Sequence, residues 1–175
     1  MTRVIEGINK QILAGFAPLL EYPSLLTISN AISCKESCSS VSTEAARHLS
    51  HFVDWLSVTE LYDAEELYTR TFYVAPLCIP YVSVHLFGEE NFRRGELMAQ
   101  LKSAFLREGF DPGSELPDHI ATLLRFCAFI DEEELEELLH YCIVPSVREM
   151  SKQFEAARNA YSHIFKALEI LFAGG

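Results

Sequence analysis

The sequence predicts an all-α fold: a single compact helical-bundle domain over residues 1–175 with a long C-terminal helix. Two observations predict it. Apolar residues recur every three or four positions in almost every segment, and the alternation typical of a β-strand is missing. The length of 175 residues suits one domain with a sizeable core, and the sequence contains no internal repeat.

The N-terminal half is expected to be helical except for a serine-rich loop. Helices are expected over about 5–20, 24–32, 43–56 and 59–74. Pro23 ends the first of them, and the polar stretch 33–43 is expected to be a loop. Ser42 or Thr43 can cap the helix that follows this loop.

The C-terminal half begins with a long apolar connection over residues 75–91, which has at most one turn of helix and either packs down or lines a groove. The stretch CIPYVSVHLF within it is the best strand candidate but has no partner strand. Helices are expected over 91–107, over 117–129, after Asp131 and from about Pro145 to Leu171. Asp131 and Glu134 form the pattern of a capping box. The last helix would be roughly 40 Å long.

The charge balance excludes several partners. The chain has 25 acidic and 14 basic residues, a formal net charge of -11, which argues against nucleic acid and anionic membrane surfaces. It suits a cationic partner or simply keeps the protein soluble. No apolar run approaches the roughly 20 residues that span a bilayer, and the N-terminus lacks a signal-peptide pattern. The odd number of cysteines, five, together with the lack of a signal-peptide pattern, predicts a reduced, cytoplasmic location.

The sequence predicts neither a metal site, a cofactor nor an enzyme. Cys34 and Cys38 are spaced as two ligands could be, but the spacing of His48 and His51 does not place them well on one face, and the pattern lacks zinc-finger regularity. A phosphate-binding loop and a nucleophile elbow are both missing. Two alternatives stay open: an acidic helical adaptor that uses the cluster at 131–137, and a redox- or metal-responsive regulatory protein.

Pro117, Asp118 and His119 lie together at the N-terminus of the predicted helix 117–129. Helix-capping rules explain Pro117, Asp118 and the nearby Glu115, because proline suits the first helical position and acids suit the first turn. They do not explain His119, whose cation would be disfavoured there, so we expect a neutral imidazole. A cap, a binding site and an acid–base pair remain open, although catalysis would need a nucleophile or a metal nearby.

Several segments resemble the NarJ/TorD/DmsD family of redox-enzyme maturation chaperones, most of all its nitrate-reductase assembly branch. They are LLEYPS (19–24), LYTRTFYVAP (67–76), HLFGEENFRRGELMAQL (85–101), EGFDPGSELPDHIATLLRFCAF (108–129) and RNAYSHIFKALEILF (158–172). The resemblance implies an all-helical protein that is not an enzyme. Such a protein binds the N-terminal leader, often twin-arginine, of the catalytic subunit of a molybdopterin oxidoreductase. It holds that subunit in the cytoplasm until cofactor insertion is complete, before export or membrane docking. From the charge and the lack of a long apolar run we expect no stable membrane insertion, and the protein is expected to be either a monomer or a domain-swapped dimer.

The resemblance also places a peptide-binding site. The family motif Y-x-x-L-F falls on Tyr68–Phe72, with Thr71 where leucine is usual, and the acidic–histidine loop matches 115–119. A leader guanidinium could pair with Glu115 or Asp118, while the apolar part of the leader lies in an aromatic groove. Alanine at Asp118 is therefore expected to weaken peptide binding without unfolding the protein. The predicted peptide-binding residues are Glu115, Leu116, Pro117, Asp118, His119, Tyr68, Phe72, Pro76, Tyr81, Phe87 and Phe92.

Overall fold

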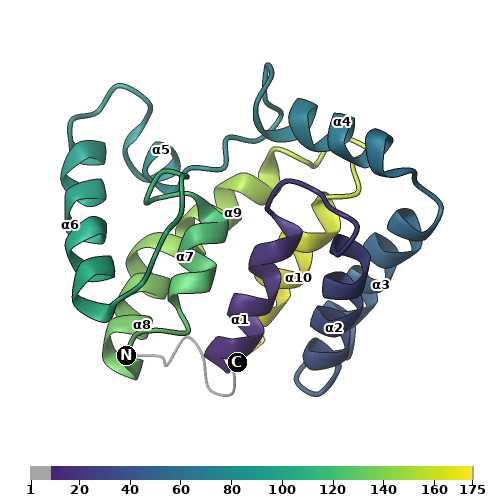
Figure 1. Ribbon diagram of the computed structural model, residues 1–175, viewed down its shortest axis with the longest axis horizontal. Coiled ribbons are helices and arrows are strands. Elements are labelled where there is room, and N and C mark those ends of the chain that lie inside the picture. Colours follow the sequence, from purple (N-terminus) through teal and green to yellow (C-terminus); the bar gives the residue numbers. More distant parts are fainter. Residues whose placement is uncertain (1–8, 175) are drawn as a thin grey trace.

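The computed structural model describes residues 9–174, and every regular element in that range is a helix (Figure 1). The all-α prediction is therefore confirmed. In chain order the elements are α1 (Lys10–Phe16), the 3-10 turn η1 (Ala17–Leu19), α2 (Thr27–Ser39), α3 (Thr43–Ser57), α4 (Leu61–Phe72), α5 (Val82–Phe87), α6 (Arg93–Glu108), α7 (Ile120–Phe126), α8 (Glu132–Leu138), the π-helical turn η2 (Leu139–Ile143), α9 (Val144–Lys152) and α10 (Ser162–Ala173).

Helix α7 is near the centre of the core. Within Ile120–Phe126 only Arg125 is not buried, which is typical of a helix covered on all sides. Helix α1 packs against α7 and α2, and α10 packs against α3 and α9. Figure 1 shows α6 at one end of the molecule and α2 with α3 at the other, with α1, α7, α9 and α10 between them.

The prediction of one long C-terminal helix is wrong, because the chain breaks between α9 and α10. After Lys152 the backbone tightens, because the N–H groups of Phe154 and Glu155 bond to carbonyls three residues back. Asn159 lies just before α10, and its Oδ1 accepts the backbone N–H of Tyr161 at 2.9 Å. Its Nδ2 also donates to Thr71 Oγ1 on α4 at 2.8 Å. The apolar period continues across the break because Phe154 and Tyr161 are both buried.

The prediction of a serine-rich loop over residues 33–43 is also wrong, because α2 continues through Ser39. Cys34 and Cys38 lie one turn apart and are buried, so burial of this face holds the helix together. The hydroxyls of Ser37 and Ser39 donate to carbonyls of the same helix. Of the predicted first helix, residues 5–8 lie outside the described residues, and α1 begins after Asn9, whose side chain accepts the N–H of Gln11.

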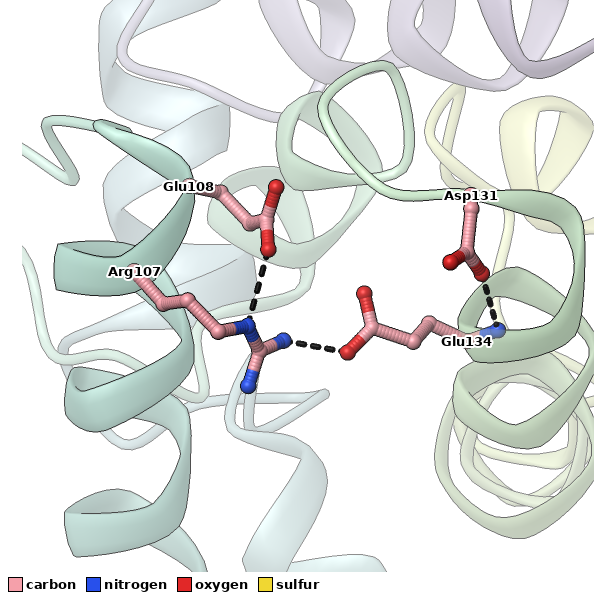
Figure 2. Close-up of polar contacts among 4 residues, drawn as sticks. All are labelled: Arg107, Glu108, Asp131 and Glu134. Carbon is pink, nitrogen blue, oxygen red and sulfur yellow. Dashed lines mark hydrogen bonds and ion pairs between the residues drawn. The ribbon is translucent and has the colours of Figure 1, made fainter.

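Two predicted helix caps are confirmed. Ser42 Oγ accepts the N–H of Ala45 at 3.2 Å, and Asp131 Oδ1 accepts the N–H of Glu134 at 2.9 Å. The Glu134 side chain extends away from the cap and pairs with Arg107, which also contacts Glu108 at 2.8 Å (Figure 2). This exposed ion pair links the end of α6 to the start of α8.

Helix α7 starts three residues later than predicted, and His119 is its N-cap. The imidazole Nδ1 accepts the N–H of Ala121 at 3.1 Å, so this nitrogen carries no proton. Burial lowers the pKa of His119 more strongly than the charges of Glu115 and Asp118 raise it. The expectation of a neutral imidazole agrees with this arrangement.

Asp118 lies inside the protein and joins two distant segments. Its side chain is 0% exposed, and its Oδ2 accepts the backbone N–H of Ser83 at 3.1 Å and the Ser83 hydroxyl. Ser83 is in the first turn of α5, which has no side-chain cap of its own, so Asp118 caps α5 from 35 residues away. Arg94 Nε on α6 donates to Ser83 Oγ at 2.9 Å.

Backbone hydrogen bonds strengthen this junction. The N–H of Val82 donates to the carbonyl of Asp118, and that of Ile120 donates to the carbonyl of Pro80, both at 2.9 Å. They form a single antiparallel bridge between Tyr81 and His119. The strand candidate in the connection is therefore a helix, α5, preceded by one bridge pair.

Replacing Asp118 should destabilise the fold. The buried carboxylate does not fit the expectation that alanine here would affect binding alone. Asp118→Ala leaves the Ser83 N–H without an acceptor and should lower the free energy of unfolding by about 3 kcal/mol. Asp118→Asn keeps an acceptor and should cost about 1 kcal/mol. Urea denaturation measures both. The exposed Asp54→Ala is the control, and an equal, small effect of Asp118→Ala would contradict the capping role.

The stability of the protein should fall in mild acid because of His119. Its pKa is lower in the folded than in the unfolded chain, so the unfolded chain binds the proton more readily. The contribution to stability is complete above the ordinary histidine pKa and is lost as pH falls from about 7 to 5. His119→Asn, which can still cap but does not titrate, should show a shallower dependence in urea titrations across this range. Parallel curves would contradict this role.

Candidate functional site

A cavity of about 350 Å³ lies where the loop before α7 meets the segment between η1 and α2 and the end of α4. Its walls come from four separate segments: residues 21–22, 68–73, 112–115 and 119–125. The polar and aromatic residues that line it are Glu21, Tyr22, Tyr68, Tyr73, Ser114, Glu115, His119, Thr122 and Arg125.

Glu115 is held at this cavity by three donors. Its carboxylate accepts the hydroxyl of Tyr81 at 2.9 Å, the hydroxyl of Tyr73 at 3.0 Å and the N–H of Leu116 at 3.1 Å. Burial opposes ionisation, but these hydrogen bonds prevail and the pKa of Glu115 is lowered. The cavity therefore contains a fixed negative charge at neutral pH.

The hydroxyls of Tyr73 and Tyr81 are the donors that face the Glu115 carboxylate. Burial and the neighbouring Glu115 carboxylate raise the pKa of both Tyr73 and Tyr81, so both hydroxyls keep their protons. Because Nδ1 of His119 is an acceptor, its Nε2 carries the proton and faces the Tyr73 oxygen at 3.5 Å. His119, Tyr73 and Glu115 thus form a polar chain that ends at the carboxylate.

A second carboxylate and one guanidinium face the same cavity. Glu21 Oε1 lies 3.1 Å from Nε of Arg125, but the Nε–H is not aligned with it, so the contact is an ion pair rather than a hydrogen bond. Burial raises the pKa of Glu21, and the charge of Arg125 opposes that shift. Arg125 also donates to the carbonyl of Pro112 at 3.1 Å and lies over the ring of Phe110.

The cavity walls therefore carry two carboxylates, one guanidinium and a neutral imidazole, a net charge of one negative unit. Three tyrosine rings adjoin these charges: Tyr22 packs edge-on against Tyr68 at 5.6 Å between ring centres, and Tyr73 packs at 5.7 Å on Tyr68. Tyr22 is 59% exposed and stands at the opening. Carboxylates beside aromatic faces are suited to a cationic side chain.

The structure brings only some of the predicted site residues to this cavity. Glu115, His119 and Tyr68 line it, and Tyr81 contacts it through Glu115. Pro117, Asp118 and Phe72 are buried behind it, while Leu116 and Pro76 are exposed. Phe87 and Phe92 line a separate hollow of about 390 Å³ with Glu90 and Asn91, so the predicted aromatic residues do not line one groove.

Sequence reasoning missed six of the polar and aromatic residues that line the cavity: Glu21, Tyr22, Tyr73, Ser114, Thr122 and Arg125. A signal existed for two of them. Arg125 is the one charged residue within the apolar stretch 120–130, and an arginine in a buried helix needs a partner. Glu21 lies in LLEYPS, a segment that carries the family resemblance.

Within residues 9–174 no group of three or more histidine, cysteine or carboxylate side chains is gathered as a ready-made metal site. Cys78 and Cys127 are buried, which raises the pKa of each to about 12. Across the same range, no helix has both the length and the apolar character needed to span a membrane.

Known proteins share this fold. A solved structure from Archaeoglobus fulgidus, described as a candidate redox enzyme maturation protein, aligns with a TM-score of 0.67 and 22% sequence identity over 94% of each chain. At this identity the likeness shows a common fold. No curated protein shows a significant match to the sequence.

The family assignment rests on the sequence itself. Residues 39–166 match the family model described as nitrate reductase delta subunit. This range includes α3 to α9 and most of the cavity walls. Since the match covers well over half of the 175 residues, this chain belongs to the nitrate reductase delta subunit family.

Proposed function

We propose that this protein is a cytoplasmic maturation chaperone for a molybdopterin-dependent oxidoreductase. In this role it binds the N-terminal leader of the catalytic subunit and holds that subunit for cofactor insertion before export or membrane docking. The observation that carries the proposal is the tyrosine-lined cavity with the fixed carboxylate of Glu115 and the second carboxylate of Glu21. Family membership and the description of the Archaeoglobus fulgidus protein support it.

The charges of the cavity favour an arginine of the leader. Three of the roughly four acceptor sites on the Glu115 carboxylate are taken by Tyr73, Tyr81 and Leu116, which leaves one for an incoming donor. Among residues 9–174 the charged partner of Glu21 is the misaligned Arg125, so Glu21 can accept a better-placed guanidinium. One added cation would neutralise the net charge of the walls.

Two exposed apolar side chains close in sequence to Tyr22 suit the rest of a leader. Leu25 and Leu26 follow Tyr22 in the loop before α2 and are 82% and 67% exposed. Neighbouring exposed apolar side chains of this size can contact the apolar part of a bound peptide. The net charge of -11 would also speed the encounter with a basic peptide. This role requires neither a catalytic residue nor a resident cofactor.

Glu115→Gln should weaken leader binding. The test is calorimetric titration with synthetic N-terminal peptides of the molybdoenzyme subunits encoded in the same genome. One peptide should bind, and Glu115→Gln should reduce its affinity at least about tenfold, because a charged pair becomes a neutral hydrogen bond. Replacing the leader arginines by glutamine should cause a similar loss.

The control removes charge elsewhere. Glu132, Glu133 and Glu136 are exposed on α8, and a variant with all three as glutamine should bind the leader normally. If this variant loses affinity while Glu115→Gln retains it, the acidic face is the binding surface and the adaptor alternative is correct. If every leader fails to bind the folded protein, the proposed cavity is not a leader site.

A further inference from the structure

Three histidines meet on a part of the molecule that the cavity does not use. His48 and His51 are one turn apart on α3, and His163 is near the start of α10. Their ring centres are 5.0 Å apart for His51 and His163, 5.5 Å for His48 and His163, and 6.4 Å for His48 and His51. The sequence prediction that His48 and His51 do not share a face is therefore wrong.

Two of the rings point nitrogen to nitrogen. Nδ1 of His48 lies 3.2 Å from Nδ1 of His163. Imidazole nitrogens bind Zn²⁺ at about 2.0–2.1 Å, so two such ligands at tetrahedral angles stand about 3.4 Å apart, with ring centres about 5 Å apart. The arrangement of His48 and His163 is thus close to that of two ligands of one ion.

The protonation state also suits a metal. A hydrogen bond between two Nδ1 atoms uses one proton, and loss of that proton to the ring's other nitrogen leaves two lone pairs facing the same point.

Two positive side chains near the cluster, Arg47 and Lys166, oppose a cation at His48, and an acidic partner offsets part of each charge. Arg47 lies 3.9 Å from Glu44, and Lys166 lies 3.1 Å from Glu169. The cysteines are poor competitors, because Cys34, Cys38, Cys78 and Cys127 are buried and Cys142 is partly so.

We propose that His48, His51 and His163 bind a divalent transition-metal ion of the kind that prefers imidazole, with Zn²⁺ as the type case. His48 and His163 are the fixed pair. The third ligand is not preset, and His51 supplies it by turning its exposed side chain toward them. Water would complete the coordination, as at sites with three protein ligands.

Such an ion would connect α3 to α10 across 115 residues of sequence. Because an ion that binds only the folded chain stabilises it, Zn²⁺ should raise the melting temperature in a concentration-dependent way. The inference is independent of the leader site, since none of the three histidines lines the cavity.

The test is titration of the untagged, reduced protein with Zn²⁺ by calorimetry and with Co²⁺ by absorption. We expect one ion per chain, visible Co²⁺ bands of a nitrogen-rich site, and a higher melting temperature with Zn²⁺. His48→Gln, His163→Gln and His51→Ala should each weaken binding at least about tenfold. The matched control is His140→Ala, which removes an exposed histidine outside the cluster and should bind normally.

Other outcomes would overturn the proposal. They are a failure to bind Zn²⁺, equal binding by all the variants, or a strong near-ultraviolet thiolate band with Co²⁺, which would assign the ion to cysteine. Glutamine preserves polar contacts between α3 and α10, so circular dichroism can establish that the variants are folded before titration. The two glutamine variants test the fixed pair separately, so an unfolded variant at one position leaves the other to decide.

Discussion

The hydrogen bonds of the buried Asp118 carboxylate hold together the half of the molecule that contains α5, α6 and α7. A charge that is taken out of water needs hydrogen bonds, and Ser83 provides two donors to Oδ2, while Oδ1 has no partner among the described residues. Helix α5 has six residues, too few to be stable alone, so its position depends on this external cap and on packing against α6 and α9. Arg94 extends the same junction to α6.

The junction between Asp118 and Ser83 also fixes the geometry of the cavity. Tyr81, which precedes α5, and Glu115, which precedes α7, are brought together because the backbone bridge at Tyr81 and His119 fixes their segments. His119 then caps α7 with one nitrogen and faces Tyr73 with the other. Residues that look like one motif in the sequence thus have different roles. Asp118 and His119 cap helices α5 and α7, and Glu115 places a negative charge in the cavity.

The helical period was enough to predict the fold class and most helices, because burial of one face leaves a regular trace in the sequence. It could not locate the break between Lys152 and Ser162, because Phe154 and Tyr161 stay buried within it and the apolar period continues. It also misjudged α2, because serines look like loop residues even when their hydroxyls bond to the helix backbone. Of the cavity, the motif residues Tyr68, Glu115 and His119 could be predicted. Tyr73 joins them only through tertiary packing, which sequence spacing does not encode.

The contact between Asn159 and Thr71 gives a structural reason for the threonine at position 71, where the family motif usually has leucine. Thr71 is buried, donates to the carbonyl of Leu67 and accepts from Asn159. A leucine at this position could not accept that hydrogen bond, and the amide of Asn159 would then lose a buried partner. Positions 71 and 159 therefore form a matched pair, 88 residues apart in sequence, and evolutionary change at one should be accompanied by change at the other.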